Sequence, residues 1–142
     1  MPFFLGIVKD HGMKKYFYIL LLSAFGCVST TASTVQLISR NYDAVIFDDG
    51  VDIEEAKIIG QREVIKQNLV KFYDIENPKV VTDVADLPHS EKYWFISFRE
   101  RKIANLEFIF MAIIDRQTGK VKFADDIKEE KRWILEAALL GG

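Results

Sequence analysis

The sequence predicts an α+β domain in which a helix packs on a curved antiparallel sheet of about four strands and a short helix follows. Three stretches carry this prediction. Residues 93–98 (YWFISF) alternate in side-chain direction as a strand does, and residues 106–114 are apolar at nearly every position. A strand that is apolar on both faces is usually central and covered on both sides. Residues 115–120 (DRQTGK) then predict a hairpin turn, with Gly119 at the position that needs a positive φ, and residues 121–123 predict a short edge strand.

A helix is predicted before the sheet. Asp52 and Glu55 have the spacing of a capping box, which marks a helix N-terminus. The helix is expected to end before Asn77-Pro78, because proline disfavours helical geometry in the residue before it. The apolar residues predicted to form its buried face are Ile58, Ile65, Leu69 and Phe72, widened by Ile59, Val70 and Tyr73.

The remaining elements are predicted with simpler signals. Residues 79–85 (KVVTDVA) indicate the first strand of the sheet, and residues 44–47 (AVIF) allow another short strand. Asp126 and Glu129 repeat the capping spacing, so a final helix is expected to follow and to end at Gly141. Its apolar side is predicted from Ile127, Trp133, Ile134, Ala137 and Ala138.

The composition limits what the chain can do. Its 142 residues suffice for one domain with a real core, and the formal net charge of −2 argues against non-specific nucleic-acid binding. One cysteine, Cys27, excludes an intrachain disulfide and a cysteine-rich metal site. Two histidines, His11 and His89, leave little material for acid–base chemistry.

The N-terminal region predicts export. Lys14 and Lys15 precede an apolar run that is too short for a membrane span of about 20 residues, as in a secretory signal peptide. Residues 23–27 (SAFGC) resemble the bacterial lipobox, which implies lipidation at Cys27 and a membrane anchor. We therefore expect a signal peptide at 1–26, with a true start possible at Met13, a polar tether at 27–34 and one domain at 35–142. The alternative is ordinary cleavage near residues 31–33, and both versions place the protein in the bacterial cell envelope.

Several groups of residues are candidate sites, but each also has a plainer structural explanation. The acidic residues fit no calcium-loop spacing, and two of them already serve the predicted cap. His89 stands alone in a proline-containing loop, which favours a solvated side chain. Aromatic residues around the first two long strands could line a ligand pocket, although most are expected in the core. The acidic group comprises Asp43, Asp48, Asp49, Asp52, Glu54 and Glu55. The aromatic group comprises Tyr93, Trp94, Phe95, Phe98, Phe108 and Phe110.

A charged segment lies between the two apolar strands. The simplest interpretation of this segment is a solvated hairpin end, formed by Arg99, Glu100, Arg101 and Lys102. A charged rim beside an apolar strand is also the anatomy of a protein interface. We therefore predict partner binding through Arg99, Arg101 and Lys102.

No sequence motif for catalysis was found. The chain lacks a Gly-rich phosphate loop, a metal-binding triad and a nucleophile elbow. We accordingly name no catalytic residue, no metal ligand and no cofactor, and we predict a protein that is not an enzyme.

Three stretches together resemble known families of small bacterial envelope domains. They are GVDIEEAKIIG, YWFISF and IIDRQTGKV, and the resemblance covers roughly residues 51–123. The chain resembles immunity proteins of nuclear-transport-factor-like (cystatin-like) fold, and it resembles PepSY domains. Both resemblances imply a binding or inhibitory module. The leading hypothesis is an immunity protein that neutralises a toxin, the second is a PepSY-like modulator of a secreted peptidase, and the third is a small pocket-type enzyme of nuclear-transport-factor-like fold.

Overall fold

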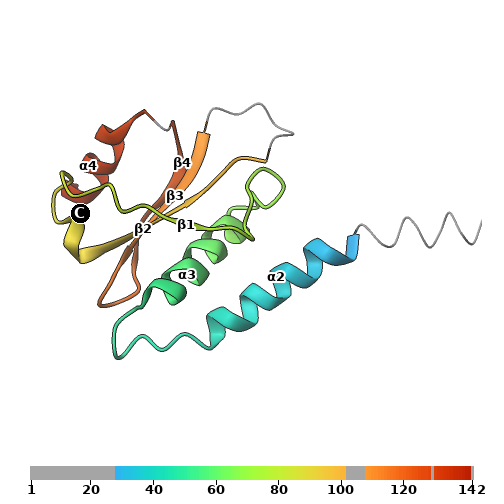
Figure 1. Cartoon of the computed structure of the whole chain (residues 1–142). Coiled ribbons are helices and arrows are strands. Elements are labelled where there is room, and N and C mark those ends of the chain that lie inside the picture. Colours follow the sequence, from blue (N-terminus) through green and yellow to red (C-terminus); the bar gives the residue numbers. More distant parts are fainter. Residues whose placement is uncertain (1–27, 102–107, 129, 142) are drawn as a thin grey trace, which may run out of the picture. The chain divides into compact units, whose positions relative to one another are not determined.

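The α+β class is confirmed by the computed structural model, which describes residues 28–101, 108–128 and 130–141. Within these residues, helices α2 (Val28–Asp43) and α3 (Ile53–Lys66) precede a four-stranded sheet, and α4 (Arg132–Leu140) follows it (Figure 1). The chain divides into two compact units, residues 1–36 and residues 37–142. The sheet belongs entirely to the second unit, which contains every contact discussed below.

The sheet is antiparallel throughout, with its strands in sequence order. It consists of β1 (Lys79–Val80), β2 (Tyr93–Phe98), β3 (Phe108–Asp115) and β4 (Val121–Lys128). A short 3₁₀ turn, Ser90–Lys92, leads into β2. The predicted meander of three antiparallel strands is therefore confirmed, although β4 continues beyond residue 123 to Lys128.

The central strand β3 is buried on both faces, as predicted. Phe110, Ala112 and Ile114 alternate with Met111 and Ile113, and all five are buried. The face bearing Phe110 also carries Ile96 and Phe98 of β2, which lie against α3. The opposite face forms a core cluster with Val84, Leu87, Phe95, Ile127, Leu135 and Leu139. Helices α3 and α4 therefore pack on opposite faces of the sheet.

The buried face of α3 coincides with the predicted one only at Ile59. Its buried residues are Ala56, Ile59, Gly60 and Val64, whereas Ile58 and Ile65 are only partly buried. A Cβ atom on Gly60 would lie 3.2 Å from side-chain atoms of both Ile96 and Phe98. The helix therefore approaches the sheet closely at Gly60, where a larger side chain would need its neighbours to move.

The end of α3 also comes earlier than predicted, at Lys66. Asn68 has φ of 61°, the left-handed conformation. Its N–H donates to the Ile65 carbonyl at 2.9 Å, and the Leu69 N–H donates to the Val64 carbonyl at 3.0 Å. This pair of bonds is a Schellman motif, which satisfies the last carbonyls of a helix. Leu69, Phe72 and Tyr73 consequently lie beyond the helix rather than on its face.

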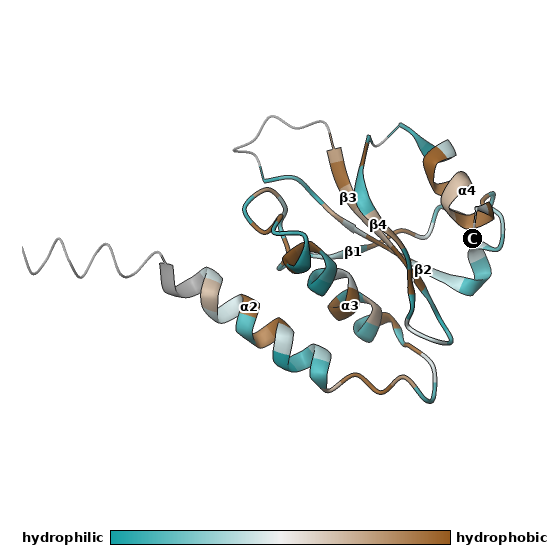
Figure 2. Ribbon diagram, turned by 180° about the vertical axis from the view of Figure 1, so that it is seen from behind, coloured by the Kyte–Doolittle hydropathy of each residue, from teal (hydrophilic) through white to brown (hydrophobic). Residues whose placement is uncertain are grey.

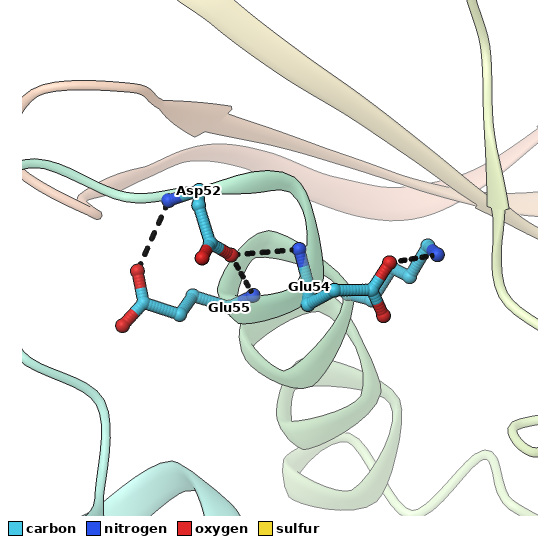
Figure 3. Close-up of polar contacts among 4 residues, drawn as sticks. Asp52, Glu54 and Glu55 are labelled. Atoms are coloured by element: carbon cyan, nitrogen blue, oxygen red, sulfur yellow. Dashed lines mark hydrogen bonds and ion pairs between the residues drawn. The ribbon is translucent and has the colours of Figure 1, made fainter.

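The predicted capping box at the start of α3 is confirmed. The Asp52 carboxylate accepts from the N–H groups of Glu54 and Glu55, both at 2.8 Å (Figure 3). The Glu55 carboxylate accepts in turn from the Asp52 N–H at 3.0 Å. Lys57 pairs with Glu54 at 2.6 Å. These bonds satisfy the N–H groups that a helix leaves unpaired at its start.

The predicted β3–β4 hairpin is present, and Gly119 has φ of 68°. Asp115 organises the turn, since its carboxylate accepts from the Gln117 N–H at 2.9 Å, the Thr118 N–H at 2.8 Å and the Thr118 hydroxyl at 2.9 Å. Burial alone would raise the pKa of Asp115, but the hydrogen bonds from Thr118 and Gln117 outweigh it and lower that pKa. A Cβ atom on Gly119 would lie 2.4 Å from the Phe47 ring, so the turn also needs glycine for space.

The predicted first strand is much shorter than residues 79–85. After β1 the Val81 N–H still donates to the Phe95 carbonyl at 2.8 Å. The chain then leaves the sheet edge and buries Val84 and Leu87 against the face that α4 covers. Arg132 of α4 holds this segment, because its guanidinium contacts the Asp83 carbonyl and the Asp86 carboxylate.

Two further expectations at the ends of the domain are corrected. Residues 28–43 form α2, so the polar tether expected at 27–34 is helical from Val28, and residues 44–47 form no strand. At the other end, Asp126 belongs to β4, and α4 begins at Arg132 without a side-chain cap. Glu129, the other half of the expected cap, lies outside the described residues, as do the predicted signal peptide and Cys27.

Candidate protein-binding surfaces

The segment predicted to bind a partner, Arg99–Lys102, is partly used by the fold. Glu100 pairs with Tyr73 as an isolated bridge, and the Asp74 N–H donates to the Arg99 carbonyl at 2.9 Å. The Arg101 side chain donates through Nε to the Tyr73 carbonyl at 3.0 Å and is only partly exposed. Arg99 is exposed, whereas Lys102 lies outside the described residues. The segment is therefore no simple hairpin end, and only Arg99 presents an exposed side chain in its described part.

Tyr73 is the buried polar group beneath this segment. Its side chain is 1% exposed and packs against the Phe110 ring, with 5.9 Å between ring centroids. Burial raises the pKa of Tyr73 above its usual range, and the hydrogen bond to Asp126 raises it further. The negative charges of Asp126, Glu100 and Asp125 act in the same direction. The Tyr73 hydroxyl is therefore held neutral as a structural hydrogen-bond donor.

The other candidates from the sequence are dispersed. Among the described residues, no three His, Cys, Asp or Glu side chains lie where they could hold a metal ion. His89 is exposed, with φ of 56°, at the start of the 3₁₀ turn. Phe95, Phe98 and Phe110 are core residues. The rings of Phe98 and Phe110 pack edge to face, with 6.0 Å between their centroids.

A surface that sequence reasoning misassigned is the outer face of α4. Leu135 and Leu139 are the buried residues of this helix, whereas Trp133 is 62% exposed and Leu140 is 66% exposed. Ala137 lies between them and is also exposed, so the three follow helical spacing of four and three residues. Figure 2 shows that the ribbon of α4 is mostly brown, the colour of apolar residues. Trp133, Ala137 and Leu140 therefore form an exposed apolar stripe in addition to the buried one, beside the charged residues Arg132 and Glu136.

The rim of this α4 face is charged with both signs. Lys131 lies over the Trp133 ring, with 5.8 Å from its Nζ to the ring centroid. Glu130 and Glu136 are exposed nearby along the chain. Arg132 is engaged with Asp83 and Asp86. An apolar centre with a rim of mixed charge is typical of a protein interface.

A cleft of about 580 Å³ lies elsewhere, between α3 and the segment that enters β1. One wall is a single stripe of α3 at helical spacing, and the other is the chain from Glu76 to Lys79. Gln61 ties the two walls together, since its side-chain amide donates to the Ile75 carbonyl at 2.7 Å. The residues that line the cleft are Asn41, Glu54, Lys57, Ile58, Gln61, Glu76, Asn77, Pro78 and Lys79.

Comparisons of the chain with protein-family models, with curated proteins and with solved structures gave no match. In the part of the chain that the structure describes, none of the helices combines the length and apolar character needed to cross a membrane.

Proposed function

We propose that this chain is a non-enzymatic binding protein of the bacterial cell envelope, and that its partner is a protein toxin that it neutralises. The binding role is supported by the outer face of α4, where Trp133 and Leu140 are mostly exposed beside Ala137. Contiguous exposed apolar residues with a polar rim mark interaction sites, and tryptophan is enriched among the residues that dominate binding energy. The toxin as partner is supported only by the resemblance of residues 51–123 to immunity proteins.

The charges around α4 favour a protein over a lipid surface as the occupant of this face. A helix that lies on a membrane usually carries Lys and Arg along its polar side. Here Lys131 is accompanied by Glu130 and Glu136, and Arg132 is neutralised by Asp86 at 3.2 Å. A rim of balanced charge suits a protein partner that presents both signs.

The envelope location is part of the same proposal. It rests on the signal-peptide pattern of residues 1–26 and on the lipobox-like residues before Cys27. Under this proposal Cys27 carries lipid and anchors the protein in the membrane. Substitution Cys27→Ser should abolish acyl labelling, and an unmodified mature chain beginning near Ser33 would contradict lipidation.

The test is affinity capture with the full chain from the envelope fraction of its host, followed by calorimetric titration of the purified partner. Trp133→Ser should raise Kd tenfold or more, because an interface tryptophan typically contributes more than about 1.4 kcal/mol to the binding free energy. Ile46→Ser is the matched control, since Ile46 is 61% exposed and Trp133 is 62% exposed. Ile46→Ser should leave Kd unchanged.

The identity of the captured protein decides between the specific hypotheses. A toxin whose activity the chain suppresses supports neutralisation, whereas a secreted peptidase favours the PepSY-like alternative. An unchanged Kd for Trp133→Ser removes α4 from the interface. Catalytic turnover by the purified chain would overturn the non-enzymatic role.

A further inference from the structure

The cleft beside α3 has the form of a groove between a helix and a sheet edge. Its helical wall runs from Glu54 to Gln61, which is about 10 Å at 1.5 Å per residue. That length equals about three residues of an extended chain at 3.3 Å each. Its opposite wall, Glu76–Lys79, leads directly into β1, the first strand in the sheet order. The groove therefore reaches the sheet edge at Lys79.

The backbone of β1 presents hydrogen-bonding groups at this edge. Lys79 is opposite Ser97 and Val80 is opposite Ile96. The next residue, Val81, donates its N–H to the Phe95 carbonyl, so Val81 and Phe95 form a hydrogen-bonded pair. Such pairs alternate along an antiparallel ladder, and the N–H and C=O of Val80 therefore point away from β2.

The other sheet edge, on β4, is closed by side chains. The Ala124 carbonyl accepts from the Gln67 side-chain amide at 2.7 Å. The Asp126 N–H donates to the Asp125 carboxylate at 2.7 Å. Charged side chains and local caps of this kind are how proteins block strand addition. On the β1 edge the groove ends at Lys79, the residue before Val80, so an extended chain that leaves the groove along this edge would reach the outward backbone groups of Val80.

We propose that this groove binds an extended segment of a partner protein, which adds to the sheet beside β1 and hydrogen-bonds to Val80. Peptides often bind in this way between a helix and an edge strand, with main-chain bonds supplying affinity. The lining suits such a segment. Ile58 and Pro78 are apolar. The side-chain amides of Gln61 and Asn77 each donate one bond within the protein, and their carbonyl oxygens can accept from peptide N–H groups.

The charges of the groove define the segment further. Glu54 and Lys57 form an ion pair of 2.6 Å on α3, and Glu76 and Lys79 provide one charge of each sign on the other wall. The groove is thus formally neutral, and it matches an uncharged polar backbone better than a strongly acidic or basic one. This inference rests on the proposed protein-binding function, although it concerns a surface other than the α4 face.

The probe for the test is a phage-displayed library of random decapeptides, selected on the full-length protein. A selected peptide is then titrated into ¹⁵N-labelled protein, with amide shifts and hydrogen exchange as readouts. We expect the largest shifts along β1 and the α3 stripe, and slower exchange of the Val80 amide in the complex.

Two variants and one control make the test specific. Val80→Pro removes the outward N–H, and proline is tolerated where the N–H of an edge strand faces outward. Ile58→Arg fills the groove from its helical wall. Each should weaken the peptide Kd by about tenfold, the effect of losing roughly one good contact. Lys128→Pro places proline on the opposite edge and should leave Kd unchanged, with amide dispersion confirming that all three variants fold.

The outcomes separate this inference from the proposed function. Peptide binding that Val80→Pro and Ile58→Arg leave intact overturns the groove. Failure to select any peptide also overturns it, and the proposed function survives that result if the captured partner still binds through Trp133. Loss of partner binding together with failure of peptide selection would end both proposals.

Discussion

The indole Nε1 of Trp94 donates a hydrogen bond of 2.8 Å to the backbone carbonyl of Val51. This bond joins β2 to the chain that enters α3. The same indole lies under the Arg116 guanidinium, with 3.8 Å from its Cζ to the ring centroid. The Arg116 carbonyl in turn accepts from the Val51 N–H at 2.7 Å. Three segments distant in sequence are therefore fastened around one half-buried tryptophan.

Replacing Trp94 by Phe should lower the free energy of unfolding by about 1–3 kcal/mol, because the Val51 carbonyl loses its indole donor. Urea denaturation of the variant and the wild type measures the difference. Trp133→Phe on exposed α4 is the matched control, and it should change stability by less than about 0.5 kcal/mol. Equal effects of the two substitutions would show that the indole hydrogen bond contributes nothing.

The central core position Phe110 should be among the most sensitive to truncation. It is 0% exposed and contacts the rings of Tyr73 and Phe98. Phe110→Ala should cost about 3–5 kcal/mol, since it removes buried surface and leaves a cavity. Phe108→Ala, at a partly buried position of the same strand, should cost less. A loss below about 1 kcal/mol at Phe110 would contradict its place in the core.

Tyr73 predicts a loss of stability in alkaline solution. Its folded pKa is raised, so above the unfolded value of about 10 the unfolded chain releases the proton first and unfolding becomes easier. The stability that this group provides is complete below about pH 10 and declines as pH rises further. Tyr73→Phe should therefore make the fall of unfolding free energy above pH 10 less steep, by up to about 1.4 kcal/mol per pH unit. Equal slopes for the two proteins would contradict the raised pKa.

Charge reversal should separate the two described arginines of the predicted binding segment. Arg101→Glu removes the bond from Nε to the Tyr73 carbonyl and should destabilise the fold by about 1–3 kcal/mol. Arg99→Glu changes an exposed side chain and should leave thermal stability nearly unchanged.

Binding of the captured partner then tests the segment itself. If Arg99 contributes, Arg99→Glu should weaken Kd and reduce its dependence on salt, as expected for a charge at an interface rim. An unchanged Kd across the salt series would remove Arg99 from the contact.

Local signals were sufficient for several parts of this fold. The Asp52–Glu55 spacing predicted the capping box, and the DRQTGK turn predicted the positive φ of Gly119, because both depend on residues within a few positions of each other. The apolar run of β3 correctly predicted a strand buried on both sides. In each case the physical requirement is contained in one short stretch of chain.

Choices between two apolar faces could not be made from periodicity alone. In α3, the helix comes close to the sheet at Gly60, and Ile59 and Val64 are buried on the side that faces the sheet. Ile58 lies on another side of the helix and lines the groove. In α4, apolar residues occupy more than one side of the helix, and only packing against the sheet decided that Leu135 faces inward and Trp133 outward.

The candidate surfaces show the same division. The sequence by itself determined that Arg99 and Arg101 are charged residues beside a central strand. Only the tertiary structure decided that Arg101 serves the Tyr73 carbonyl, because that contact joins residues 28 positions apart. The groove likewise requires α3 and the chain entering β1 to meet, and its walls are held by the bond from Gln61 to the Ile75 carbonyl. Short-range chemistry can be read from neighbouring residues, whereas a surface made by distant segments exists only after folding has brought them together.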